Sequence, residues 1–433
     1  MQIAMLSYHT CPLATLGGKD TGGMNVYVRE ITRHLGAAGV HVDVFTRSQD
    51  EHVPHVLHDL GYGNRVVHIP AGPEHPLPKN ELATYLPEFV HGIQEFTASK
   101  GIRYDLIHSH YWMSGVAAIE LRKTWKIPVA HMFHTLVVMK NRVAQSPNEI
   151  EGEYRLEGEK TVLASVDRII AATPAELAQL QWLYRADVRK VVVIPPGVDT
   201  CRFYPIPADE AKEYIGVPPC GRMILFVGRI EPLKGLDVLL ESIALLRQKD
   251  VLGEYRFCLV VIGGEAISDN DLLSTEMARI HALREQYGLN DLVAFLGKRS
   301  QDTLPYYYSA AEVVVVPSYY ESFGMVALEA MACGIPVVAS QVGGLAYLVQ
   351  DGITGFTVPV DDPQALADRL MQLLSNPALR TSMGKKAEQT AREYAWGEIA
   401  QKLLMVYSDL IQKGESRADG NQYGIAQSRR VPS

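Results

Sequence analysis

Short apolar runs recur along the whole chain, and a longer stretch with helical periodicity separates each from the next. Seven runs occupy residues 3–7, 42–46, 65–70, 106–110, 129–133, 168–173 and 191–197, and five more occupy residues 224–228, 257–263, 293–297, 313–318 and 337–340. Many are rich in valine and lack polar alternation, which is typical of parallel strands buried on both faces. The pattern predicts an α/β fold of doubly wound sheets covered by helices.

The length of 433 residues exceeds what one ordinary core organises, so two domains with a cleft between them are expected. The break falls at residues 195–210, where prolines and a glycine interrupt the pattern. We therefore predict domains at residues 1–195 and 196–395. A last helix, 396–413, is expected to pack back on the first domain, and the polar residues 414–433 are expected to form a disordered tail.

Charge and cysteine usage exclude several classes of protein. The formal net charge of -8 argues against a nucleic-acid-binding protein, which needs a basic surface. The five cysteines, Cys11, Cys201, Cys220, Cys258 and Cys333, form no CxxC pair, so neither a zinc site nor a disulfide framework is indicated. We expect the first residues to form a buried strand and not a signal peptide, and no run approaches the roughly 18 apolar residues of a spanning helix. We expect a cytoplasmic protein without stable membrane insertion, and the sequence leaves its oligomeric state open.

Ligands of open α/β sheets bind beyond the carboxyl ends of the strands, so the residues that follow each run carry the most information. After the first run, Gly22 and Gly23 directly precede an amphipathic helix that ends near Gly39. Glycines let a ligand approach the backbone, and the positive end of a helix attracts phosphate. A flexible loop with an ordinary helix cap is an equally good interpretation of two glycines alone.

A second loop, in the segment ILFVGRIEPLKG, places Arg229 and Lys234 between a strand and the next helix. Two cations at the carboxyl edge of a sheet suit a diphosphate leaving group, because they offset the negative charge that grows as a glycosidic bond breaks. The alternative is a pair of surface charges without a role. Their position after a strand favours a function.

The most informative segment is VVVVPSYYESFGMVALEAMACG, which carries two carboxylates eight positions apart. Glu321 lies in the turn after a strand, and Glu329 lies on an otherwise apolar helix, where an unpaired carboxylate would be costly. Carboxylates accept hydrogen bonds from the hydroxyls of a sugar or a ribose. Ser322, Phe323 and Gly324 offer backbone N–H groups to phosphate. A binding site is therefore favoured over two solvated acids.

Five motifs together, GGMNVY, HTL, PPGVDTCRF, GRIEPLKG and ESFGMVALEAMACG, resemble those of the retaining GT-B glycosyltransferases of family 4 type, which share two glutamates separated by seven residues. The resemblance extends to about residue 412. It implies two Rossmann-like domains that face each other across a cleft, and a UDP-sugar donor. We assign ten residues to the donor: Gly22, Gly23, Arg229, Lys234, Arg299, Glu321, Ser322, Phe323, Gly324 and Glu329.

Within this assignment Glu321 binds the transferred sugar and Glu329 the ribose, while Arg229 and Lys234 hold the diphosphate. His134, the histidine of HTL, is expected near the reacting centre, although the residue pattern alone favours an ordinary core histidine. We take His134, Arg229, Lys234 and Glu321 as the catalytic set. The acceptor hydroxyl is expected to attack on the face that the diphosphate leaves, with a phosphate oxygen taking its proton, so that no cofactor and no catalytic metal are needed.

The N-terminal half is similar to the inositol-phosphate glycosyltransferases of mycothiol biosynthesis, through SYHTCPL, DTGGMNVYV, YDLIHSHYWMSG and HTLVVMKN. That similarity implies an acceptor-phosphate pocket of Lys79, Tyr111, Thr135 and Arg155, with Asn25 facing acceptor hydroxyls. Taken singly, Lys79 and Arg155 are more commonly surface charges. DTGG also resembles the sucrose-phosphate synthases, whose acceptor is fructose 6-phosphate, so the acceptor ring stays open.

Two further features are set aside. The DxD of Asp269, Asn270 and Asp271 resembles a metal motif but falls in a polar loop, and the run Tyr306 to Tyr308 suits packing and a helix start. The expected activity is transfer of glucose or N-acetylglucosamine to a small phosphorylated acceptor. The alternatives are a membrane-associated transferase with a lipid-linked acceptor and a non-catalytic nucleotide-sugar sensor.

Overall fold

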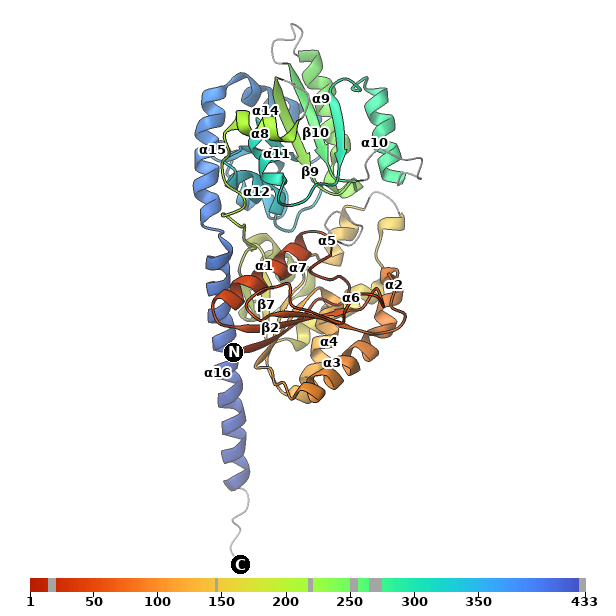
Figure 1. Ribbon diagram of the computed structural model, residues 1–433, viewed down its shortest axis with the longest axis vertical. Coiled ribbons are helices and arrows are strands. Elements are labelled where there is room, and N and C mark those ends of the chain that lie inside the picture. Colours follow the sequence, from red (N-terminus) through yellow and green to blue (C-terminus); the bar gives the residue numbers. More distant parts are fainter. Residues whose placement is uncertain (15–20, 145–146, 217–220, 250–255, 265–274, 428–433) are drawn as a thin grey trace, which may run out of the picture.

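The computed structural model describes residues 1–14, 21–144, 147–216, 221–249, 256–264 and 275–427 of the chain. Within these ranges the protein forms two α/β units, one above the other in Figure 1, each built around its own sheet. The candidate DxD at Asp269–Asp271 lies outside the described residues.

The N-terminal unit holds an eight-stranded sheet in the order β3-β4-β2-β1-β5-β6-β7-β8. Its strands are β1 (Gln2–Leu6), β2 (His41–Arg47), β3 (Val56–Leu57), β4 (Arg65–Ile69), β5 (Leu106–His110), β6 (Val129–Met132), β7 (Arg168–Ala171) and β8 (Val191–Val193). All pair in parallel except the short β3, which is antiparallel to β4. Its helices are α1 (Gly23–Ala37), α2 (Lys79–Leu82), α3 (Leu86–Lys100), α4 (Trp112–Trp125), α5 (Val137–Arg142), α6 (Glu153–Ser165) and α7 (Pro174–Tyr184), with short 3₁₀ turns at Ala83–Tyr85, Pro147–Glu149 and Val188–Lys190.

The C-terminal unit holds a parallel six-stranded sheet in the order β11-β10-β9-β12-β13-β14. Its strands are β9 (Arg222–Val227), β10 (Phe257–Ile262), β11 (Val293–Gly297), β12 (Val313–Val316), β13 (Val337–Ser340) and β14 (Gly355–Val358). Its helices are α8 (Ala208–Ile215), α9 (Leu236–Lys249), α10 (Thr275–Gln286), α11 (Leu304–Ala310), α12 (Met325–Ala332), α13 (Leu345–Leu348), α14 (Pro363–Ser375) and α15 (Pro377–Arg392), with a 3₁₀ turn at Pro232–Lys234.

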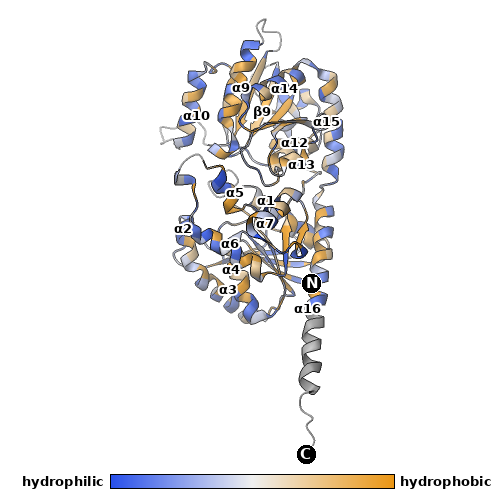
Figure 2. Ribbon diagram, turned by 180° about the vertical axis from the view of Figure 1, so that it is seen from behind, coloured by the Kyte–Doolittle hydropathy of each residue, from blue (hydrophilic) through white to orange (hydrophobic). Residues whose placement is uncertain are grey.

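The predicted architecture of two doubly wound parallel sheets is confirmed, and each of the twelve apolar runs coincides with a strand. Two strands were not predicted, β3 and β14. Strand β3 has two residues, too few for any periodicity, and β14 (GFTV) is a short segment with no run of valines. Figure 2 shows hydrophobic residues gathered on the strands and on the helix faces that cover them.

The last helix, α16 (Trp396–Gln427), starts at the C-terminal unit and packs against α1 of the N-terminal unit. Its inner face buries Trp396, Ile399, Leu403, Tyr407 and Leu410, which recur at helical spacing. The helix continues past residue 413 to Gln427, whereas the polar composition predicts a disordered tail from residue 414. No proline interrupts residues 414–427, so backbone hydrogen bonds can propagate from the packed part of the helix.

Among the described cysteines, Cys11, Cys201 and Cys333 are free, while Cys258 on β10 is disulfide-bonded. The scattered cysteine spacing did not predict that bond. No helix in the described part of the chain combines the length and the apolar character needed to cross a membrane.

Candidate functional site

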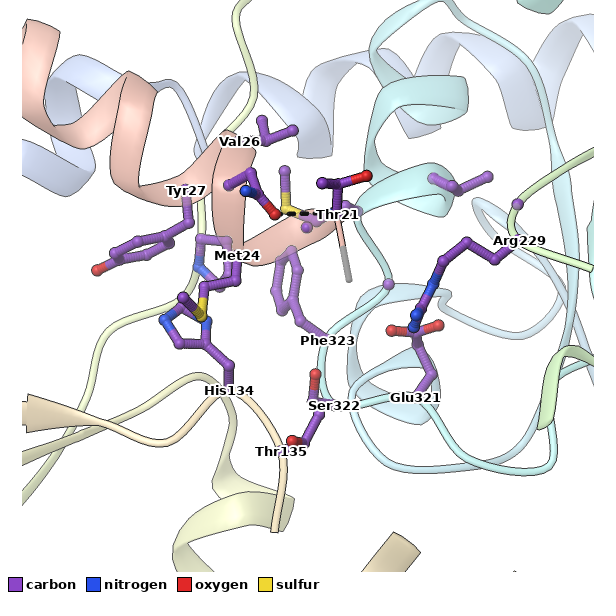
Figure 3. Close-up of a pocket in the computed structure, with 18 of the residues that line it drawn as sticks. Thr21, Met24, Val26, Tyr27, His134, Thr135, Arg229, Glu321, Ser322 and Phe323 are labelled. Carbon is purple, nitrogen blue, oxygen red and sulfur yellow. Dashed lines mark hydrogen bonds between the residues drawn. The ribbon is translucent and has the colours of Figure 1, made fainter. Parts of the chain in front are cut away.

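A cavity of about 350 Å³ lies between the two units, at the carboxyl ends of both sheets. All but one of the residues that we assigned to a site line it: Gly22, Gly23, Asn25, Lys79, Tyr111, His134, Thr135, Arg229, Lys234, Arg299, Glu321, Ser322, Phe323, Gly324 and Glu329. The exception is Arg155. Figure 3 shows His134 and Thr135 on the N-terminal side of this space and Arg229 and Glu321 on the C-terminal side.

Lys234 and Glu321 form an ion pair with 2.6 Å between Nζ and Oε2, and both side chains are about four-fifths buried. The turn that carries Glu321 is held by the loop after β13. Gly344 N–H donates to the carbonyl of Glu321 at 3.0 Å. Gly343 has φ +44°, and a Cβ there would lie 1.9 Å from that same carbonyl oxygen. The segment QVGG therefore fixes Glu321, a role that sequence reasoning missed because two glycines after a strand usually indicate only a turn.

Arg229 comes from the loop after β9 and pairs with Glu231 at 2.8 Å. The Arg229 side chain extends to the N-terminal unit and lies beside Gly22, where an added Cβ would be 4.0 Å from Arg229 Nε. Arg299, after β11, donates to the Tyr307 hydroxyl at 3.0 Å. Arg229, Lys234 and Arg299 therefore lie together on the C-terminal wall, where Glu231 and Glu321 balance two of the three charges. Their N–H groups can serve as donors to an anionic ligand.

Glu329 lies on α12 and is 5% exposed. The Tyr308 hydroxyl donates to its Oε2 at 2.8 Å, so the carboxylate is not unpaired. Burial raises the pKa of Glu329 to about 7, although Tyr308, Arg202 and Arg29 oppose the shift. Tyr308 belongs to the aromatic run that we assigned to packing. It does pack, but it also orients Glu329.

Helix α12 begins at the cavity behind Gly324, which has φ +108° and no side-chain cap. Its positive end therefore faces the same space as Arg229 and Lys234. Helix α1 begins on the opposite wall at Gly22 and Gly23. Two helix N-termini and several cations converge on one cavity, which is an arrangement suited to a diphosphate.

Asn25 holds loops together on the N-terminal wall. Its amide donates to Thr10 Oγ1 at 2.7 Å and to the carbonyl of Cys11 at 2.8 Å, and its Oδ1 accepts from Gly22 N–H at 2.9 Å. The residue is 1% exposed. We expected it to face acceptor hydroxyls; the structure gives its amide three partners within the protein.

Tyr111 and His134 follow β5 and β6 in a left-handed backbone conformation, with φ of 70° and 63°. This conformation is strained for residues other than glycine and tends to occur at functional sites. His134 Nε2 lies 3.0 Å from His110 Nδ1, and the Tyr27 ring packs edge-on against it. Burial lowers the pKa of His134 to about 3, so the imidazole is neutral near pH 7.

Arg155, on α6, lies behind Tyr111 and Thr135 and is 1% exposed. Its guanidinium carbon is 4.9 Å from the centre of the Tyr111 ring, and Nη2 donates to Thr135 Oγ1 at 2.9 Å. Burial lowers the pKa of Arg155, but Tyr111 and two nearby carboxylates outweigh it, so the pKa is raised. The structure thus gathers the four proposed phosphate ligands, with Lys79, Tyr111 and Thr135 on the cavity wall and Arg155 supporting them from behind.

Other residues on the wall were not found from sequence, among them His9, Tyr320 and Gln301. Nothing in their local sequence distinguishes them, since each reaches the cavity only through folding.

Two family models cover most of the chain. Residues 21–202 match Glycosyltransferase Family 4, and residues 208–390 match Glycosyl transferases group 1. A D-inositol 3-phosphate glycosyltransferase from Salinispora arenicola is 40% identical over 417 residues, which is 95% of this chain and 92% of that protein. One from Actinosynnema mirum is 40% identical over 94% of this chain and 96% of its own length.

Solved structures give the same result. The sucrose-phosphate synthase from Thermosynechococcus elongatus superposes with a TM-score of 0.86 at 36% identity, covering 95% of this chain and 99% of that one. Anabaena HepE, solved with UDP and glucose, shares the fold with a TM-score of 0.72 at 20% identity, covering 95% of this chain and 100% of its own. Family models, close relatives and fold agree: the chain belongs to the GT-B glycosyltransferases of family 4 type.

Proposed function

We propose that the protein is a retaining glycosyltransferase that moves glucose or N-acetylglucosamine from a UDP-sugar to a small phosphorylated acceptor, either an inositol phosphate or fructose 6-phosphate. The observation that carries the proposal is the division of the cavity wall. Lys79, Tyr111 and Thr135 lie on the N-terminal side, and Lys234 and Glu321 lie on the C-terminal side. The names of two relatives, D-inositol 3-phosphate glycosyltransferase and sucrose-phosphate synthase, both contain a phosphorylated compound.

In this proposal the donor lies against the C-terminal unit. Glu329 accepts hydrogen bonds from the ribose hydroxyls, and Glu321 does so from the transferred sugar. Arg229, Lys234 and the N-terminus of α12 surround the diphosphate and stabilise the charge that it gains on leaving.

The reaction balances without a protein nucleophile. The bond between the anomeric carbon and the diphosphate oxygen breaks, the acceptor oxygen bonds to that carbon on the same face, and the acceptor proton passes to the departing diphosphate. His134 is neutral, so its part is to donate or accept a hydrogen bond beside the reacting carbon.

The test is a grid of two donors, UDP-glucose and UDP-N-acetylglucosamine, against inositol phosphate, fructose 6-phosphate and their unphosphorylated parents. Charge-assisted hydrogen bonds contribute roughly 1.5 to 3 kcal/mol each, so removing the phosphate should lower kcat/KM by orders of magnitude. Equal rates with and without the phosphate would refute the acceptor assignment and favour a lipid-linked acceptor.

We also expect transfer to continue in EDTA, because cationic side chains and helix termini can neutralise the diphosphate without a bound cation. The measurement is the initial rate before and after chelation, with magnesium and manganese added back. Activity that disappears with EDTA and returns with either metal would contradict this expectation.

A further inference from the structure

Every nitrogen of the buried Arg155 guanidinium already has a partner. Nε donates to Glu159 at 2.9 Å, Nη1 pairs with Glu151 at 2.8 Å, and Nη2 donates to the carbonyl and the hydroxyl of Thr135 at 3.0 and 2.9 Å. These contacts use four of the five guanidinium N–H groups, and the fifth is the second N–H of Nη1. A phosphate at Tyr111 and Thr135 therefore meets Nη1 already paired with a carboxylate, and it can take both N–H groups of Nη1 only if Glu151 leaves.

Glu159 is fixed in place. Its side chain is completely buried, its two oxygens accept from the backbone N–H of Val137 at 3.1 Å, and the Tyr184 hydroxyl donates to it. Moving the Glu159 carboxylate away from Arg155 would break all of these contacts, so we expect it to stay in place when a ligand binds.

Glu151 differs from Glu159 in its burial and in the partners of its carboxylate. It precedes α6, and its side chain is 15% exposed. Its two oxygens have separate partners, Oε2 with Arg155 and Oε1 with Lys140 at 2.5 Å. Asn141 anchors its backbone through two hydrogen bonds, of 2.9 and 3.0 Å. The carboxylate can therefore turn away from Arg155 while its backbone stays in place and Lys140 keeps it paired.

We propose that Glu151 is a specificity-determining residue: it occupies Arg155 Nη1 in the acceptor-free enzyme and is displaced by the acceptor phosphate. A phosphate dianion replaces the lost charge and brings three acceptor oxygens to Arg155, Thr135 and Tyr111. A hydroxyl cannot replace that charge, so an unphosphorylated acceptor leaves Glu151 where it is. The inference rests on the proposed function, since it assumes a phosphorylated acceptor at this wall.

The experiment compares Glu151→Gln with the wild type. Glutamine keeps the shape and one acceptor oxygen but binds Arg155 without charge, so the phosphate meets less competition. KM for the phosphorylated acceptor should fall roughly tenfold, while KM for the unphosphorylated parent changes by less than about twofold. Inorganic phosphate alone should raise the melting temperature of the variant more than that of the wild type.

Glu153→Gln is the matched control, because it removes the same charge from an exposed position two residues away. It should leave both KM values within about twofold of the wild type, which separates a direct contact from general electrostatics. Adding Arg155→Lys should abolish the effect of Glu151→Gln, because the two residues act through one contact.

A raised KM in Glu151→Gln, or KM values equal to those of Glu153→Gln, would overturn the inference and leave Arg155 as a support for Thr135. The phosphate-induced melting shift decides the case independently of activity. If the wild type itself shows no preference for phosphorylated acceptors, the proposed function fails; if it does and Glu151→Gln changes nothing, only this inference fails.

Discussion

The ion pair of Lys234 with Glu321 places a cation and a carboxylate 2.6 Å apart on the C-terminal wall of the cavity, where we propose that the donor binds. Lys234→Ala should lower kcat roughly 100-fold, because the diphosphate loses a charge that matters most as the bond breaks. Arg229→Ala should act in the same direction. Steady-state kinetics with Lys385→Ala, an exposed lysine of α15 away from the cavity, as control would test this. Full activity in both Arg229→Ala and Lys234→Ala would remove these residues from the mechanism.

The buried carboxyl of Glu329 makes stability depend on pH. Burial raises its pKa from 4.5 to about 7. Between these two pH values the folded protein therefore retains a proton that the unfolded chain has lost. The stability from this proton is complete below about pH 4.5 and is lost as the pH rises through about 7.

Glu329→Gln cannot ionise and escapes this loss. The free energy of unfolding of the variant, relative to the wild type, should therefore rise by on the order of 1 to 3 kcal/mol between about pH 5 and about pH 8. Urea unfolding at the two pH values measures it, with Glu398→Gln, an exposed carboxyl of α16, as control. A relative stability that is the same at both values would show that Glu329 titrates normally.

At the scale of elements, the apolar runs were enough to predict the sheets, because buried parallel strands need continuous apolar residues whatever their neighbours. The same reasoning brought most of the candidate residues to one cavity, since strand ends in a parallel sheet must meet at one edge. What it could not supply was contact between distant segments. Gly343 is needed only because the Glu321 carbonyl lies against it, and Arg155 supports Thr135 only because α6 packs behind the loop that follows β6.

Helix α16 is attached to the N-terminal unit partly through a buried hydrogen bond of 2.6 Å between the Tyr407 hydroxyl and His108 Nδ1. Tyr407→Phe leaves a buried polar atom unsatisfied and should lower the free energy of unfolding by about 1 to 3 kcal/mol. Tyr27 provides the matched control, since its buried hydroxyl has no hydrogen-bond partner within the described residues. Tyr27→Phe should change stability by less than about 0.5 kcal/mol or increase it. Denaturant unfolding of both variants decides, and equal losses would contradict this account of α16.

For the whole molecule, one hydrophobic cluster extends across both units, and each unit also has a cluster of its own. A single cluster of buried residues runs from Tyr27 and Val28 on α1 through Val198, Phe203 and Trp396 to the helices of the C-terminal unit. Polar contacts add to it at the cavity edge. Gln301 Oε1, after β11, accepts from Arg29 on α1 and from Arg202 of the linker at 3.2 Å. This one amide therefore joins both units and the linker between them.

Gln301→Ala should leave the fold stable, because Arg29 keeps Glu30 at 2.9 Å and Arg202 keeps Asp302 at 3.4 Å. It should nevertheless raise KM for the donor several-fold. The residues proposed to bind the donor come from both walls, Gly22 and Gly23 from one and Arg229 from the other, and they stay at the right distance only while the two units keep their relative position. Gln301 itself lines the cavity, so Arg29→Ala, which removes a side chain outside it, must reproduce the effect. Gln364→Ala, an exposed glutamine of α14, should have none. Solution scattering should show a larger radius of gyration in both Gln301→Ala and Arg29→Ala, and a higher KM in Gln301→Ala alone would mean that Gln301 binds the donor directly.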